Sequence, residues 1–215
     1  MNYFRRIQSY YHEAVIAAGV LYLIGIAGLA WLGHVPEVWY ATGPFLLFTG
    51  LLLFAFHENP DKKDIFPVVF AFFAGFATEW LGTNTGWPFG EYSYGTILGP
   101  ALWNTPLLIG FNWLLLTYIV RVWLLQLKIN SWLSVLLGAS ILVIYDYLLE
   151  PVAIFSGMWT WADGYPPLQN YAGWMGLSLI ILTAYHFMGF FPRNRMAPWI
   201  LLFQLLFFGT LHFLI

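Results

Sequence analysis

The chain has 215 residues, of which 60% are hydrophobic and only 8% are charged. A soluble domain carries roughly 25% charged residues, so this composition predicts an integral membrane protein. The absence of cysteine excludes disulfides, thiolate catalysis and cysteine-ligated metals. The eight Lys and Arg residues are too few and too scattered to form a nucleic-acid-binding surface.

Seven apolar runs are long enough, or nearly so, to cross a bilayer as helices, which takes about 20 residues each. They cover residues 14–33, 39–56, 65–81, 105–125, 132–150, 171–191 and 197–215. No internal repeat and no linker divides the chain. The sequence therefore predicts one transmembrane domain, residues 1–215, folded as an all-α bundle of seven transmembrane helices.

The basic residues predict how this bundle is oriented. With seven spans, every Lys and Arg falls on the side of the N-terminus: Arg5, Arg6, Lys62, Lys63, Arg121, Lys128, Arg193 and Arg195. Cytoplasmic segments of membrane proteins carry an excess of Lys and Arg. We therefore expect a multi-pass protein of the plasma membrane with its N-terminus in the cytoplasm and its C-terminus outside.

Acidic and aromatic residues favour the opposite, outer side. Six of the ten acidic residues lie there: Glu37, Glu79, Glu91, Asp146, Glu150 and Asp163. Eight of the twelve Trp residues are also at or near the outer ends of the spans. An aromatic belt alone populates both interfaces, so the excess indicates that the outer half holds more than a belt.

The longest outer connection, residues 82–104, is dense in Gly, Pro, Tyr and Trp. A loop of this length without regular structure is usually functional or disordered, and its aromatic content argues against disorder. We expect an ordered, half-buried cap over a site. The simpler alternative is an interfacial loop that only anchors two helices.

Three carboxyl groups are placed near the outer ends of two spans. Asp146 and Glu150 are spaced i and i+4, which puts them on one helix face. Pro151 disfavours the helical state of Glu150 and predicts that the helix ends there, with Asp146 about one turn inside and Glu150 at the rim. Glu79 lies about a turn from the end of its span. Charged groups within spans usually face an interior cavity. Each one alone could be a rim carboxylate in water, but three at one depth predict a shared site.

Further polar residues, and the residue types that are missing, narrow the range of reactions that the protein could catalyse. Asn112 either joins two helices or belongs to the site, and Gln204, in the middle of the last span, is most simply an interhelical hydrogen-bonding residue. Five scattered His do not make a metal-binding box, and we predict no metal site. No outer Lys or Arg is available to hold a diphosphate, and the last two spans lack the Lys of a retinal Schiff base. Carboxylates, amides and aromatic faces remain, which suit acid–base chemistry on a neutral hydrocarbon.

Several motifs together resemble a known family. They are E-x-x-G-x-x-T-G-x-x-F-G-x-Y-x-Y from Glu79 to Tyr94, then Pro106 and Trp113, D-x-x-x-E-P from Asp146 to Pro151, and W-x-W from Trp159 to Trp161. The pattern, over roughly residues 65–190, is similar to the membrane ψ-end-group hydratases of carotenoid biosynthesis, of the γ-carotene and bisanhydrobacterioruberin hydratase type. The resemblance implies hydration of the terminal double bond of an acyclic carotenoid end group to a tertiary alcohol, without a cofactor.

The mechanism that fits this resemblance needs one carboxylic acid and one carboxylate. The acid protonates C2 of the end group and leaves a tertiary cation at C1, which a water deprotonated by the carboxylate attacks. Different environments allow two carboxyl groups to serve as acid and base in one site. We expect Asp146 as the acid and Glu79 as the base, or the reverse, with Glu150 orienting one of them. The expected substrate-binding residues, some of which would stabilise the cation through aromatic faces, are Tyr92, Tyr94, Phe89, Asn112, Trp113, Trp159 and Trp161.

Two alternatives remain open at this point. A cyclase or isomerase of carotenoid end groups also begins with protonation but excludes water. A carotenoid- or isoprenoid-binding membrane protein would need no catalytic carboxyl group. The expected partners are a lipophilic carotenoid, membrane lipid and other enzymes of the carotenoid pathway, and not nucleic acid.

Overall fold

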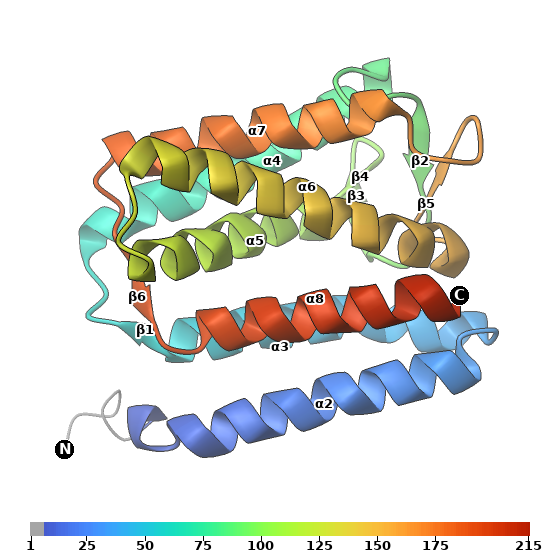
Figure 1. The fold of residues 1–215 in the computed structure, drawn as a ribbon. Helices are drawn as coiled ribbons and strands as arrows, with labels where there is room; N and C mark the ends of the chain where they lie inside the picture. The colour runs from blue at the N-terminus through green and yellow to red at the C-terminus, as the bar shows by residue number, and fades with distance from the viewer. Residues whose placement is uncertain (1–6) are drawn as a thin grey trace.

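The computed structural model describes residues 7–215, so Arg5 and Arg6 lie outside the described residues. Its main elements are helices that run roughly along one common direction (Figure 1). They are α2 (Tyr11–Leu32), α3 (Thr42–Ala55), α4 (Ile65–Thr85), α5 (Leu107–Gln126), α6 (Ser131–Ser156), α7 (Leu168–Phe187) and α8 (Ala197–Leu214). The short 3-10 helices η1 (Pro36–Ala41) and η2 (Lys62–Asp64) precede α3 and α4.

Within the described residues, six helical segments are long and apolar enough to cross a membrane, by length and composition. They are α2, η1 with α3, η2 with α4, α5, α6 and α8. This agrees with an all-α membrane protein. The segment missing from this set is α7, whose 20 residues include the polar Gln169, Asn170 and His186. The seven-span topology therefore stays a prediction.

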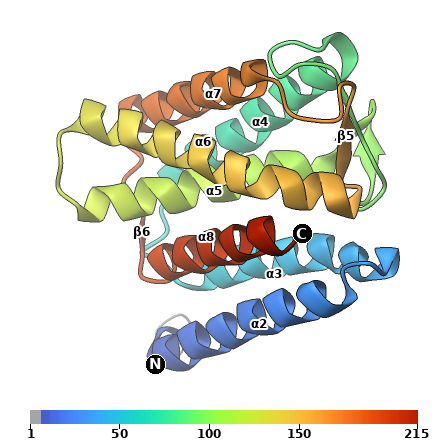
Figure 2. The same cartoon turned by 45° about the vertical axis from the view of Figure 1, so that its right-hand side comes forward.

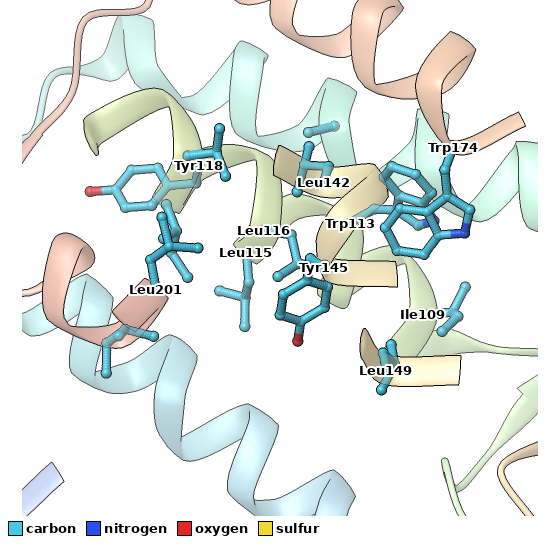
Figure 3. Packing of buried hydrophobic residues seen from close by; sticks show 14 of the residues in the cluster. Ile109, Trp113, Leu115, Leu116, Tyr118, Leu142, Tyr145, Leu149, Trp174 and Leu201 are labelled. Carbon is cyan, nitrogen blue, oxygen red and sulfur yellow. The ribbon is translucent and has the colours of Figure 1, made fainter. Parts of the chain in front are cut away.

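The helices form two groups (Figures 1 and 2). In one group α4 packs on α5 and α6 packs on α7, whereas α8, α3 and α2 lie along one side of that group. The core is centred on α5, which is buried over most of its length. Figure 3 shows part of this core, with labelled side chains from α5 and α6 and with Leu201 of α8 on the side of Tyr118. A cavity lined by residues of both groups lies between them, and the site described below is found there.

Short strand pairs close both ends of the bundle. At one end β1 (His57–Glu58) pairs antiparallel with β6 (Arg193–Asn194). At the other end β2 (Tyr92–Tyr94) pairs with β5 (Trp159–Trp161), and β3 (Ala101–Leu102) pairs with β4 (Thr105–Pro106). The described Lys and Arg residues all belong to the β1–β6 end: Lys62, Lys63, Arg121, Lys128, Arg193 and Arg195. The basic residues are therefore segregated in the fold, and the direction of insertion stays a prediction.

The end of α6 differs from the sequence prediction. The helix does not end at Glu150 but continues through Pro151 to Ser156, where Gly157 in the left-handed conformation (φ 75°) terminates it. A proline inside a helix removes its own N–H bond, and its ring crowds the carbonyl group of residue i−4. In membrane helices neighbouring groups compensate for the freed backbone groups, so a proline there does not have to end the helix. Glu150 consequently lies six residues before the helix end, and Asp146 ten residues before it. Both carboxyl groups are deeper in the bundle than expected.

The connection after α4 also departs from the prediction. Helix α4 continues to Thr85, so Glu79 lies six residues from its end, and Gly86 (φ 75°) terminates it. The segment predicted to lack regular structure contains β2 and β3, and it is partly buried. The 151–170 connection likewise contains β5. The cap is therefore a paired-strand structure held by backbone hydrogen bonds.

We predict that the β2–β5 end of the bundle faces the periplasm or the cell exterior. The chain lacks cysteine, so single cysteines at the exposed Thr96 and Gln169 should react with an impermeant thiol reagent in intact cells whose outer membrane, if present, is permeabilised. A cysteine at the exposed Lys63, at the other end, should react only after lysis. The reverse labelling pattern would refute this orientation.

Candidate active site

The strands β2 and β5 present four aromatic side chains to the interior. Successive side chains of a strand point to opposite faces, so Tyr92 and Tyr94 share one face, as do Trp159 and Trp161. The register pairs Tyr92 with Trp161 and Tyr94 with Trp159, and the paired ring centroids lie 5.0 Å and 6.0 Å apart. On the opposite, exposed face, Ser93 and Thr160 are hydrogen-bonded to each other at 3.2 Å. The strand pair β2–β5 is therefore aromatic on its inner face and polar on its outer face, and we call it the aromatic lid.

Two of the lid's residues hold the carboxyl group of Glu79, which is only 4% exposed. The hydroxyls of Tyr92 and Tyr94 donate to Oε2 at 2.6 Å and 2.7 Å, and Nε1 of Trp113 on α5 donates to Oε1 at 2.9 Å. Burial and the adjacent Glu79 carboxylate raise the pKa of both tyrosines. The phenols therefore remain donors at physiological pH, and all three contacts stabilise an ionised Glu79.

The other two lid residues hold Glu150. Nε1 of Trp159 and Nε1 of Trp161 donate to Oε2 of Glu150 at 3.1 Å and 2.9 Å. An indole N–H can only donate, so Glu150 is an acceptor in both contacts. Hydrogen bonds to charged groups contribute about 1.5–3 kcal/mol each, which offsets part of the desolvation of a buried carboxylate. The lid thus joins α4 and α6 through their carboxyl groups.

Asp146 is bound differently. Its carboxyl group is completely buried, and Oδ2 accepts a 2.6 Å hydrogen bond from Nδ2 of Asn170 on α7. The same Asn170 nitrogen lies 3.3 Å from Oε1 of Glu150, so it links the two carboxyl groups. Oδ1 of Asp146 has no hydrogen-bond partner. Of the three carboxyl groups, Asp146 is therefore the one with an oxygen free to carry a proton.

All three carboxyl groups line one cavity of about 360 Å³ between the two groups of helices. Its walls are mostly apolar and come from α2, η1, α3, α4, α5, α6, α7, α8 and the lid. No Lys or Arg is among the residues that line it. An apolar cavity with a few convergent polar groups is typical of a small-molecule site, and this one is suited to a neutral, lipophilic ligand.

The remaining residues expected at the site are placed as follows. Asn112 and Phe89 line the cavity, and Phe89 also packs against Tyr92. Trp113 is fully buried behind Glu79 and does not line the cavity. Its ring packs on that of Trp174 at a centroid distance of 4.2 Å. Among the described residues, no group of three or more His, Asp or Glu is arranged to hold a metal ion.

Two residues that the sequence did not single out belong to the site. Asn170 links Asp146 to Glu150, and Trp174, one turn further along α7, packs on Trp113 and lines the cavity. Their i, i+4 spacing on a helix was a possible signal. It was missed because Asn170 was assigned to the loop before the helix.

The geometry defines a buried carboxyl site under an aromatic lid, and residues 43–214 match the family model described as carotenoid biosynthesis protein. The chain belongs to this family. It is also 30% identical, over 154 residues, to the bisanhydrobacterioruberin hydratase of Haloarcula japonica. The alignment covers 66% of this chain and 52% of the relative, so the chain spans about half the length of that curated relative. No solved structure matches the chain.

We predict that Gly82→Ala destabilises the site. A methyl group at this position would lie 2.8 Å from the Tyr92 hydroxyl and 2.9 Å from the Phe89 ring, and overpacking of this kind costs about 1–3 kcal/mol. Gly176→Ala in α7 is the matched control, because nothing lies within 4 Å of its added methyl group. Thermal unfolding in detergent should show a lower midpoint for Gly82→Ala only. Equal midpoints would contradict the close packing of Tyr92 over α4.

Proposed function

We propose that this protein hydrates the terminal carbon–carbon double bond of an acyclic carotenoid end group to a tertiary alcohol, without a cofactor. Membership of the carotenoid biosynthesis family and the similarity to a hydratase support this proposal. The observation that carries it is the unpartnered Oδ1 of Asp146 in the wall of an apolar cavity. A carboxylic acid at that place can donate a proton to a neutral hydrocarbon.

Asp146 is the proton donor in this proposal. It protonates C2 of the end group, and the positive charge develops at C1. Glu150 and Glu79 accept all their hydrogen bonds from indole, phenol and amide donors, an arrangement that suits two fixed negative charges. Preorganised charges of this kind stabilise a developing ion without reorganisation.

This assignment changes the role that the sequence indicated for Glu79. Its two oxygens already accept from Tyr92, Tyr94 and Trp113, which leaves little capacity to bind and deprotonate a water. We therefore assign Glu79 to electrostatic stabilisation of the cation. Asp146, ionised after the first step, is the base that takes the proton back from the added water.

The lid supplies aromatic faces to the same cation. Tyr92, Tyr94, Trp159 and Trp161 all line the cavity, and an aromatic face can stabilise a desolvated cation by about 2 kcal/mol or more. The carotenoid would reach this cavity from the plasma membrane, in which we place the protein. Other carotenoid-pathway enzymes are its proposed partners, because they make or consume the same lipid-dissolved compounds.

The product test is direct. Expressed in a bacterium that makes lycopene or γ-carotene, the protein should yield a pigment whose mass is increased by one water molecule. The added oxygen should come from labelled water and not from O₂. A product of unchanged mass would favour an end-group cyclase or isomerase, and label from O₂ would identify an oxygenase.

The carboxyl groups can be tested separately. Asp146→Asn and Glu79→Gln are near-isosteric. Asp146→Asn should lower the hydration rate by about 10²–10⁴-fold, the usual contribution of acid–base catalysis, and Glu79→Gln by about 10²–10³-fold, the usual effect of removing one electrostatic stabiliser. Glu150→Gln should give a partial defect, because its loss weakens only the charge beside Asp146. Glu91→Gln and Asp163→Asn are the controls, since both side chains are exposed at the β2–β5 end and both variants should retain activity. An inactive Glu91→Gln with an active Asp146→Asn would place the chemistry outside the cavity.

A further inference from the structure

A second polar group lines the same cavity from the α2, α3 and α8 side. It consists of Tyr22 (5% exposed), Thr49 (2%) and Gln204 (4%). The side chains of Thr49 and Gln204 lie close to the Tyr22 hydroxyl but not in the geometry of a hydrogen bond. The three residues come from three different helices, so the fold brings them together at the cavity wall.

Two polar atoms of this group lack a partner. The Tyr22 hydroxyl and Oε1 of Gln204 are buried and make no hydrogen bond within the described residues. The side chain of Gln204 does lie against Tyr22 of another helix, as the interhelical role indicated by the sequence requires, but its carbonyl oxygen is left without a hydrogen bond. Leaving a buried polar group unsatisfied costs about 1–3 kcal/mol. These two atoms and Oδ1 of Asp146 are the unpartnered buried atoms on the residues that line the cavity.

The chemistry of the group selects a small neutral ligand. Oε1 of Gln204 can only accept a hydrogen bond, whereas the Tyr22 hydroxyl can donate and accept. Thr49 donates its hydroxyl to the carbonyl oxygen of Phe45 at 3.0 Å and keeps its own oxygen as an acceptor. No cationic side chain lines the cavity, so an anion is disfavoured. A water molecule matches, because buried waters typically make about 2–4 hydrogen bonds to otherwise unsatisfied groups.

Tyr145 lines the same cavity as this group and as Asp146. It precedes Asp146 on α6 and interacts electrostatically with both Tyr22 and Asp146. Figure 3 shows its ring extending from α6 into the space between the helix groups, with the hydroxyl at the tip. The Tyr22–Gln204 group, Tyr145 and Asp146 therefore all line the same cavity.

We propose that Tyr22 and Gln204, with Thr49, hold the water molecule that the enzyme adds to the carotenoid. This inference rests on the proposed function and assigns its second substrate a binding site. After Asp146 has protonated C2, the water oxygen forms a bond to the C1 cation, and one proton of that water returns to the Asp146 carboxylate. The net change is the addition of one H₂O across the double bond.

The test separates protonation from water addition. In Tyr22→Phe and in Gln204→Met the cation still forms, but it loses a proton and returns to an alkene. In deuterated buffer the unhydrated carotenoid should therefore gain deuterium at its end group, while the hydration rate falls about tenfold or more. Mass spectrometry of the pigment measures both quantities, and retained absorbance of bound pigment shows that each variant is folded. Tyr185→Phe is the matched control, because Tyr185 is a fully buried tyrosine that bonds Thr117 and does not line the cavity.

The outcomes are distinct. Hydration at the wild-type rate in the Tyr22→Phe, Gln204→Met double variant would overturn the water site while leaving the proposed function intact. An equal fall in hydration and in deuterium incorporation would also overturn it, because the residues would then act on protonation or folding. Wild-type hydration combined with weaker binding of hydroxylated pigments would show that the group binds a hydroxyl of the pigment. A wild-type protein that hydrates no acyclic carotenoid would refute the proposed function itself.

Discussion

The site depends on burying carboxyl groups in an apolar bundle without a cation beside them. Glu79, Asp146 and Glu150 are each at most 4% exposed, and no Lys or Arg lines their cavity. Desolvating a carboxylate costs several kcal/mol, so each group needs donors. Neutral donors supply them: two phenols, three indoles and one amide. This choice keeps the cavity free of positive charge, which would repel the proposed cation.

The need for these donors explains the form of the lid. Tyr92 and Tyr94 bond Glu79, and Trp159 and Trp161 bond Glu150, because a two-residue period puts alternate side chains on one face. The strand pairing between them sets the separation of the two carboxyl groups. A flexible loop carrying the same residues could not hold four donors in one register. The lid is therefore a positioning element for α4 and α6.

The sequence predicted the membrane class, the segregation of basic residues and the three carboxyl groups, because these depend on composition and on spacing within one helix. The predictions from sequence failed where contacts between distant segments of the chain determine the local structure. Pro151 indicated a helix end by its local preference, yet α6 continues to Ser156. The Y-x-Y and W-x-W spacings already had the period of a strand, but strands as short as β2 and β5 form only by pairing with each other. Asn170 was missed for the same reason, since its role exists only when α7 lies against α6.

Gln204 illustrates the limit of reading a polar residue in a membrane helix from sequence alone. Such a residue most often bonds a neighbouring helix, and nothing in the last span indicated otherwise. In the fold its Oε1 and the Tyr22 hydroxyl lie in a cavity wall without a partner. A protein that only bound a hydrocarbon would gain stability from apolar residues at both positions. Two unsatisfied neutral groups in the same cavity as an unsatisfied acid instead match what the proposed addition of water to a hydrocarbon would need.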